Sequence, residues 1–151
     1  MLDFNWPGIH PRLEGLVASG SADQTIRIWD ATKKSMAMGQ SDLDCETQCI
    51  PAHKGTVLCL AGVKHSIVSG GVDNKIRIWS VQGDRQFTMY PWFEINTQLP
   101  EMTNWVTTLS VGWSEHSRGG RRTVLMAGDA QGSVAVWDVS SSHHHDMTLI
   151  P

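Results

Sequence analysis

The stretch that decides the fold is Ser66-Ile67-Val68-Ser69-Gly70-Gly71-Val72-Asp73-Asn74-Lys75-Ile76-Arg77-Ile78-Trp79-Ser80. A near-copy lies fifty residues upstream, from Leu16 to Asp30, and seven of the fifteen aligned residues are identical. A weaker third copy runs from Val124 to Asp138. Repetition at a spacing of tens of residues indicates a repeat architecture.

Each copy has the pattern of a β-hairpin. In the first copy, Leu16 to Ser19 and Ile26 to Trp29 are short apolar runs, and the polar residues Ser21 to Gln24 between them are typical of a turn. An isolated hairpin is marginally stable in water, so each copy needs further strands and a neighbouring sheet. No helical period is evident, and the pattern predicts an all-β protein.

These residues resemble a known family. The order Ser-Gly-x-x-Asp-x-x-Ile-Arg-Ile-Trp is similar to the second half of a WD repeat, the four-stranded blade of a β-propeller, and the segment from Pro51 to Val57 resembles the start of such a repeat. The resemblance implies about three blades of an incomplete propeller. Their approximate ranges are residues 1–50, 51–97 and 98–151.

The resemblance also implies a hydrogen-bonded tetrad within each blade, made by a loop His, a strand Ser or Thr, a turn Asp and the Trp. Blade two has all four residues, blade one lacks the His, and blade three keeps only the Trp, with Ala127 and Gln131 in place of Ser and Asp. The residues on tetrad positions are His53, Ser69, Asp73 and Trp79 in blade two, Ser19, Asp23 and Trp29 in blade one, and Trp137 in blade three.

Three blades are too few for a closed ring. A blade has about 40 to 45 residues and closed propellers have about 4 to 8 blades, whereas this chain has 151 residues. An open arc would expose an apolar blade face at each end. We therefore expect either a fragment of a longer protein or a ring completed by another chain, and we favour the fragment, because Met1 lies almost inside the first expected strand.

Composition limits the class of protein. The net charge of −3 gives no support for nucleic acid as the main ligand, and no apolar run approaches the roughly 20 residues that span a bilayer. The first residues have no signal-peptide pattern, and three cysteines without scaffold spacing suit a reducing compartment. We expect an intracellular, cytoplasmic protein, with the nucleus as the alternative, that does not bind membranes.

The remaining strands follow less regular patterns. The segment from Val81 to Met102 departs most from the repeat, and we predict one strand from Arg85 to Tyr90 with an insertion after it. In the other segments we expect strands at Leu2–Trp6, Glu46–Ile50, Thr56–Ala61 and Met147–Ile150. The alternation of apolar and polar residues predicts a half-buried strand at Trp105–Trp113.

His53, Ser69 and Asp73 are also the residue types of a nucleophilic triad. However, Ser69 lies in a strand pattern without the glycines of a nucleophile elbow, and a buried Trp N–H needs polar partners of this kind. We favour the structural tetrad over a hydrolase site.

Two patterns suggest a metal site, and neither is convincing. Cys45, Cys49 and His53 recur every fourth residue, but the local sequence reads as loop and strand and not as one helical face. His143, His144 and His145 are consecutive, so a strand would alternate their faces. We expect no metal and no cofactor.

Two groups remain as surface candidates. Arg118, Arg121 and Arg122 form a small basic cluster that would suit a phosphate or RNA contact, although a solvated loop is the simpler interpretation. The aromatic residues Tyr90, Trp92 and Phe93 are of the types that anchor protein interfaces, but they would equally cover the outer edge of two blades.

The sequence therefore predicts a non-catalytic protein–protein interaction scaffold or adaptor, a subunit of a multiprotein assembly. Its expected partners are other proteins, including the remaining blades of the propeller or another chain that closes the ring. The alternatives are an RNA- or phosphate-contacting subunit of a ribonucleoprotein and, less favoured, a hydrolase that uses His53, Ser69 and Asp73.

Overall fold

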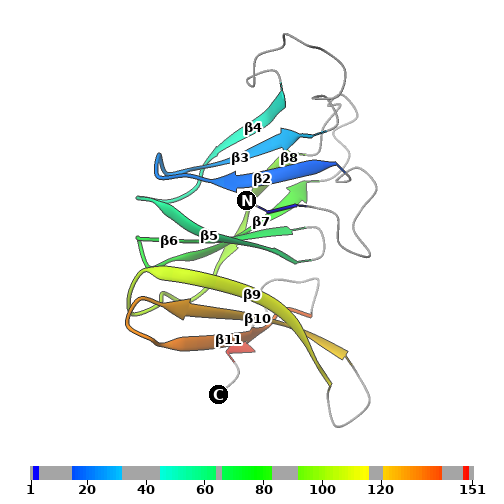
Figure 1. Cartoon of the computed structure of the whole chain (residues 1–151). Helices are drawn as coiled ribbons and strands as arrows, with labels where there is room; N and C mark the ends of the chain where they lie inside the picture. The colour runs from blue at the N-terminus through cyan, green and yellow to red at the C-terminus, as the bar shows by residue number, and fades with distance from the viewer. Residues whose placement is uncertain are drawn as a thin grey trace.

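The structure is a computed structural model, and it describes residues 2–3, 15–31, 45–63, 66–82, 92–115, 121–140 and 148–149. In these ranges every element is a strand, and the strands form three antiparallel four-stranded sheets that stack along the molecule (Figure 1). The all-β class and the blade-like sheets are therefore confirmed. We call the sheets blades one, two and three.

The strands of each blade follow chain order, so each pairs with the next one along the sequence. Blade one contains β1 (Leu2–Asp3), β2 (Leu16–Gly20), β3 (Thr25–Asp30) and β4 (Glu46–Pro51). Blade two contains β5 (Val57–Val63), β6 (Ser66–Gly71), β7 (Ile76–Gln82) and β8 (Trp92–Gln98). Blade three contains β9 (Val106–Glu115), β10 (Arg121–Asp129), β11 (Val134–Asp138) and β12 (Thr148–Leu149).

The central hairpins of the three blades turn in the same way. Gln24, Asn74 and Gly132 occupy the same position of the repeat and all have positive φ, at 76°, 62° and 87°. Asn and Gly tolerate this left-handed conformation better than most residues, so the turn residues of the repeat favour a tight connection. The hairpin tips lie along one side of the molecule, at the left of Figure 1.

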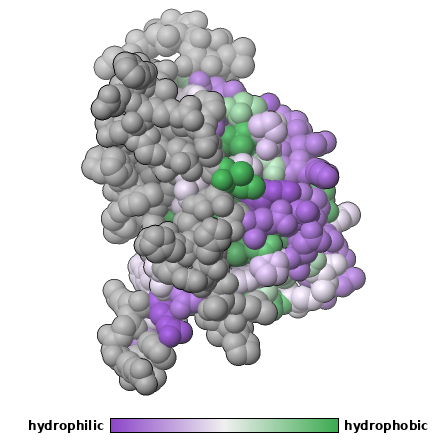
Figure 2. Space-filling view, turned by 180° about the vertical axis from the view of Figure 1, so that it is seen from behind, coloured by the Kyte–Doolittle hydropathy of each residue, from purple (hydrophilic) through white to green (hydrophobic). Residues whose placement is uncertain are grey.

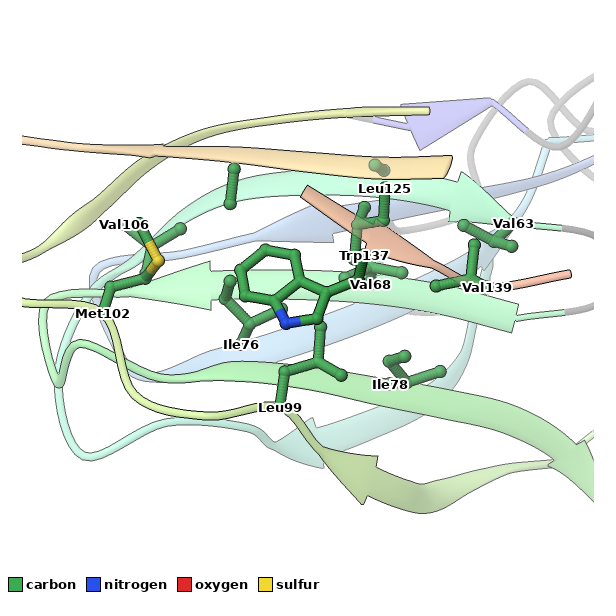
Figure 3. Packing of buried hydrophobic residues seen from close by; sticks show 12 residues of the cluster. Val63, Val68, Ile76, Ile78, Leu99, Met102, Val106, Leu125, Trp137 and Val139 are labelled. Carbon is green, nitrogen blue, oxygen red and sulfur yellow. The ribbon is translucent and has the colours of Figure 1, made fainter. Parts of the chain in front are cut away.

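The core consists of two apolar layers, one between each pair of neighbouring blades. Alternate residues of β2 and β3 pack against blade two, which contributes Val57, Ile67 and Trp79. The opposite face of blade two packs in the same way against Val106, Leu125 and Trp137 of blade three (Figure 3). Trp79 thus packs against blade one, and Trp137 packs against blade two. Successive side chains of a strand point to opposite faces of the sheet, so the strands of blade two contribute to both layers.

The fourth strand of blade two corrects one prediction. We expected an insertion after Tyr90, but residues 92–98 form β8, which pairs with β7 through Val81↔Phe93 and Trp79↔Ile95. The unpaired edge of β7 favours another strand even though Trp92–Gln98 lacks clean alternation. The predicted strand Arg85–Tyr90 lies outside the described residues.

Candidate functional site

Blade two contains a continuous hydrogen-bonded chain of side chains. Trp79 Nε1 donates to Ser69 Oγ at 2.9 Å, and Ser69 Oγ lies 2.8 Å from His53 Nε2. His53 Nδ1 lies 2.7 Å from Asp73 Oδ1. These distances fit one direction of donation, in which the serine hydroxyl donates to Nε2 and the Nδ1–H donates to the carboxylate.

Arg77 joins this network from β7. Its Nη1 lies 2.9 Å from Asp73 Oδ2 and 2.6 Å from His53 Nδ1. Because both nitrogens are donors in this arrangement, the Asp73 carboxylate is the acceptor for both of them. Sequence reasoning missed this role, although Arg27 and Arg77 belong to the identical Ile-Arg-Ile run.

The electrostatics keep the imidazole neutral. Burial lowers the pKa of His53 most, against the opposing effect of Asp73, and the positive charge of Arg77 lowers it further. The pKa of Asp73 is lowered: burial acts to raise it, but the hydrogen bonds from His53, the Lys54 amide and Arg77 outweigh that effect. The result is a neutral histidine fixed between a hydroxyl and a carboxylate.

This geometry does not suit nucleophilic catalysis. Ser69 is 0% exposed, and its hydroxyl already accepts from the Trp79 indole. A nucleophile has to reach a substrate atom, and here sheet and indole enclose it. The three residue types of a triad are brought together, but what they can do chemically is to hold β6, β7 and the loop before β5 in register.

Blade one has a shorter version of the network. Trp29 Nε1 donates to Ser19 Oγ at 2.8 Å. Asp23 accepts from the Thr25 hydroxyl at 2.6 Å and pairs with Arg27 Nη2 at 2.6 Å, and these bonds lower the pKa of Asp23. Among the described residues of blade one, no histidine stands beside Ser19.

Blade three replaces the network with apolar side chains. By strand register, Ala127 of β10 is equivalent to Ser69 of β6. Met102 is equivalent to His53, because it precedes Val106, the first residue of β9, by four residues, as His53 precedes Val57, the first residue of β5. Trp137 is 1% exposed, and among the described residues its Nε1 has no acceptor. Figure 3 shows its ring among Ile76, Leu99 and Leu125.

The turn of blade three uses an aspartate that sequence reasoning missed. Asp129 Oδ1 accepts from the amides of Gln131 and Ser133, both at 2.9 Å, and Oδ2 accepts from Thr103 Oγ1 at 2.5 Å. Its pKa is lowered, chiefly by the bond from Thr103. Asp129 stands two residues before the expected position, and the signal for it was an Asp three residues before Gly132.

The hairpin tips and the loops before β5 and β9 form one side of the molecule, which we call the loop edge. Its described members are Ser21–Gln24, His53–Thr56, Val72–Lys75, Asn104–Trp105 and Ala130–Ser133. Trp105 is 53% exposed there, although its carbonyl accepts from the Ala130 amide at 3.0 Å and its amide donates to Asn104 Oδ1 at 2.7 Å. Sequence reasoning assigned Trp105 to a strand and did not single it out.

The other predicted surface residues are not brought into one site. Trp92 and Phe93 begin β8, and Tyr90 lies outside the described residues. Arg118 also lies outside them, Arg121 begins β10, and Arg122 Nε lies 3.4 Å from Asp138 Oδ2. In the described ranges, Arg122 is thus paired with a carboxylate of its own blade.

The described residues contain neither a metal-binding cluster nor a helix that could span a membrane. The part of the chain that the structure describes contains no group of three His, Cys, Asp or Glu side chains that could hold a metal ion, and Cys45, Cys49 and Cys59 are free thiols. The predicted histidine run at residues 143–145 lies outside the described ranges. Within those ranges, no helix has the length and apolarity that a membrane span requires.

Known proteins share this repeat. The family model "WD domain, G-beta repeat" matches residues 8–30 and 44–80. Striatin from Mus musculus is 35% identical over 74 residues, which are 47% of this chain and 9% of striatin. The ribosome biogenesis protein WDR12 homolog from Chlamydomonas reinhardtii is 28% identical over 135 residues, which are 85% of this chain and 26% of that protein.

A solved structure shows the same architecture. The crystal structure of the computationally designed Ika4 protein matches with a TM-score of 0.58 and 21% identity, over 91% of this chain and 66% of that chain. At this identity the match concerns the fold alone. The chain spans about a tenth of striatin and about a quarter of the WDR12 homolog. The two matched segments, the stacked four-stranded sheets and these relatives support a WD-repeat family for this chain.

Proposed function

We propose that this chain is a non-catalytic protein-interaction subunit of a multiprotein assembly and that it contacts its partner through the loop edge. The observation that carries the proposal is Trp105, a large aromatic side chain that is 53% exposed on a backbone held by two hydrogen bonds. Rigid, exposed aromatic side chains lose little conformational entropy on binding and often anchor protein interfaces.

The loop edge and the residues just before Trp105 also carry polar side chains. Lys75 Nζ pairs with Glu101 Oε1 at 3.0 Å, and Asp129 is held by the Thr103 hydroxyl. Figure 2, which views the molecule from behind, shows hydrophilic and apolar side chains interspersed over the described part of the back face. Interfaces that form and separate have such a mixed surface, with one or two buried anchors at the centre.

The relatives support a binding role, and they do not point to any single reaction. By name, one is a ribosome biogenesis protein and another, from Medicago truncatula, is a putative E3 ubiquitin-protein ligase that is 33% identical over 72 residues. A repeat shared by proteins of such different roles supports a common scaffold. Free cysteines support a location inside the cell, and the proposed partners include the polypeptide that completes the ring.

The test compares the partners captured by the tagged chain with those captured by two variants of it. We expect Trp105→Ala to weaken the binding of a specific partner by about 2 kcal/mol, or roughly 30-fold. The matched control is Ile95→Ala, which truncates an equally exposed side chain on the outer strand of blade two. Equal retention of all partners by Trp105→Ala, with the fold intact by circular dichroism, would contradict the proposal.

A further inference from the structure

The outer strand of blade two has an edge that no other described strand pairs with. β8 pairs with β7 from Gln82↔Trp92 to Arg77↔Gln98, and it stands last in the order of its sheet. In an antiparallel ladder, alternate residues of such a strand direct their N–H and C=O groups away from the neighbouring strand. Within the described part of the chain, β8 therefore offers a row of backbone donors and acceptors to a further strand.

The outer strands of the other two blades are less suited to receive another strand. β12 has two described residues, and β4 ends at Pro51 and carries Glu46, whose Oε2 lies 3.2 Å from Arg27 Nε. Short strands, prolines and charged side chains are the features by which sheet edges resist the addition of a strand. β8 has seven residues with no proline, lysine or arginine among them, and Glu94 is its one charged residue. Among the described outer strands, β8 is thus the best template for strand addition.

The side chain of Ile95 provides an apolar contact beside this edge. Ile95 lies opposite Trp79 in the register, so the two side chains lie on the same face of the sheet, the one that packs against blade one. Trp79 is 5% exposed, whereas Ile95, one strand further out, is 53% exposed. An added strand with apolar residues on this face would cover Ile95.

We propose that β8 binds an extended, basic segment of a partner protein, which adds to the sheet of blade two as a fifth strand. In this mode of recognition, backbone hydrogen bonds supply the affinity and side chains at alternate positions supply the specificity. The segment has an apolar residue beside Ile95, and it has no proline at the positions that pair with β8. No residue of β8 belongs to the loop edge, so this is a second binding surface, and it does not depend on the proposed role of Trp105.

A basic segment fits this edge better than a second copy of the chain does. The chain has a net charge of −3 and the one charged residue of β8 is acidic, so two copies would meet with like charge. Two paired β8 strands would also bring together seven residues from each copy, whereas stable interfaces between folded proteins have about 20 to 30 residues on each side. An extended segment does not need an interface of that size, because its main contacts are the backbone bonds of the strand itself.

The test uses a synthetic heptapeptide that alternates lysine and valine, with lysine at both ends and with blocked termini. Its binding is followed by amide hydrogen exchange in NMR spectra, which resolve the individual residues of β8. At about 1 mM peptide, the fast-exchanging amides of β8 should exchange at least about tenfold more slowly, because their N–H groups gain an acceptor. The matched control peptide has proline in place of the central valine, has the same charge and should not slow them.

Three variants of the chain test the edge itself. Ile95→Lys places a charge beside the apolar side chains of the peptide, so the slowing should be lost. Cys49→Lys adds the same charge at an exposed position of β4 and should retain the slowing. Ile95→Ala truncates the side chain but leaves the backbone of β8 intact, so it should also retain the slowing.

Four results would overturn the inference. The first is amide exchange in β8 that the heptapeptide leaves unchanged, and the second is equal slowing by the proline peptide. The third is slowing that persists in Ile95→Lys or is lost in Cys49→Lys or Ile95→Ala. The fourth is slow exchange of all β8 amides in the chain alone, where a dimer mass would identify a second copy as the occupant and a monomer mass a segment of this chain. Trp105→Ala should change none of these rates, so failure of the loop-edge proposal is distinguishable.

Discussion

Ala127→Ser should stabilise the protein by giving the Trp137 indole the partner that the other two blades provide. Ala127 pairs with Ala135 in the register in which Ser69 pairs with Arg77 and Ser19 with Arg27. The hydroxyls of Ser69 and Ser19 accept from Trp79 and Trp29 at 2.9 Å and 2.8 Å. Among the described residues of blade one, this pair forms without a histidine, so we expect a serine to be sufficient in blade three.

The size of the stabilisation follows from the Trp137 indole N–H, which has no acceptor among the described residues. Leaving a buried N–H without a partner costs about 1 to 3 kcal/mol, and a hydrogen bond formed on folding contributes about 1 kcal/mol. Ala127 and Trp137 are each 1% exposed, so the bond would form away from water. The new hydroxyl also loses hydration, which its bond to Trp137 Nε1 offsets. We expect a net stabilisation of about 1 kcal/mol.

The measurement is equilibrium urea unfolding, in which the midpoint should rise with an unchanged m value. Indole N–H resonances in a nitrogen–proton NMR spectrum, assigned with Trp137→Phe, should show a downfield shift of the Trp137 signal. The control is Ala61→Ser, which places a hydroxyl on β5 in the same apolar layer and should destabilise by about 1 to 2 kcal/mol.

An Ala127→Ser protein that is destabilised as much as Ala61→Ser, with the Trp137 N–H signal unmoved, would refute this reasoning. It would mean that the register of blade three does not bring position 127 to the indole nitrogen. A stabilisation without any change of that signal would refute the hydrogen-bond explanation while leaving the substitution useful.

Further predictions concern blade two and the thiols. Ser69→Ala should destabilise by about 2 kcal/mol in urea unfolding, because it leaves the Trp79 indole without an acceptor and His53 Nε2 without a donor; an unchanged midpoint would contradict the tetrad. Since burial lowers the pKa of His53 below 6.5, the unfolded chain binds the proton more readily, so stability should be full above that pH and fall as the pH drops towards the folded-state value. His53→Gln should flatten this pH dependence of the unfolding free energy, and a slope as steep as in the wild type would argue against it. Burial raises the pKa of Cys59 to about 11, so a thiol reagent at pH 8 should modify exposed Cys49 first, and comparable rates at the two thiols would be inconsistent with that burial.

The sequence was informative where the repeat copies agree. Identical Ser, Gly, Asp and Trp residues at fixed spacing determine both the hairpin register and the side chains that meet across it, as Ser19 with Trp29 and Ser69 with Trp79 show. These features are local, because the turn and its two strands lie within about fifteen residues. Local consistency of this kind can be recognised without knowledge of neighbouring blades.

Other features depend on tertiary context and could not be predicted from the sequence. β8 forms at residues 92–98 because β7 offers an unpaired edge, although its own pattern is ambiguous. Alignment of the copies puts Gln131 on the position of the turn aspartate. The aspartate that closes this turn is instead Asp129, two residues earlier. The exposure of Trp105 depends on where the loop before β9 lies relative to Ala130, which no periodicity encodes.

The uneven distribution of polar bonds among the blades has a consequence for how the protein opens. Repeat proteins unfold in parts when neighbouring units differ in stability. Blade two is linked by the chain from Trp79 to Asp73, whereas the tryptophan of blade three is held by apolar packing alone among the described residues. Amide exchange should therefore be fastest in β10 and β11 and slowest in β6 and β7, with the middle sheet as the last to lose its structure.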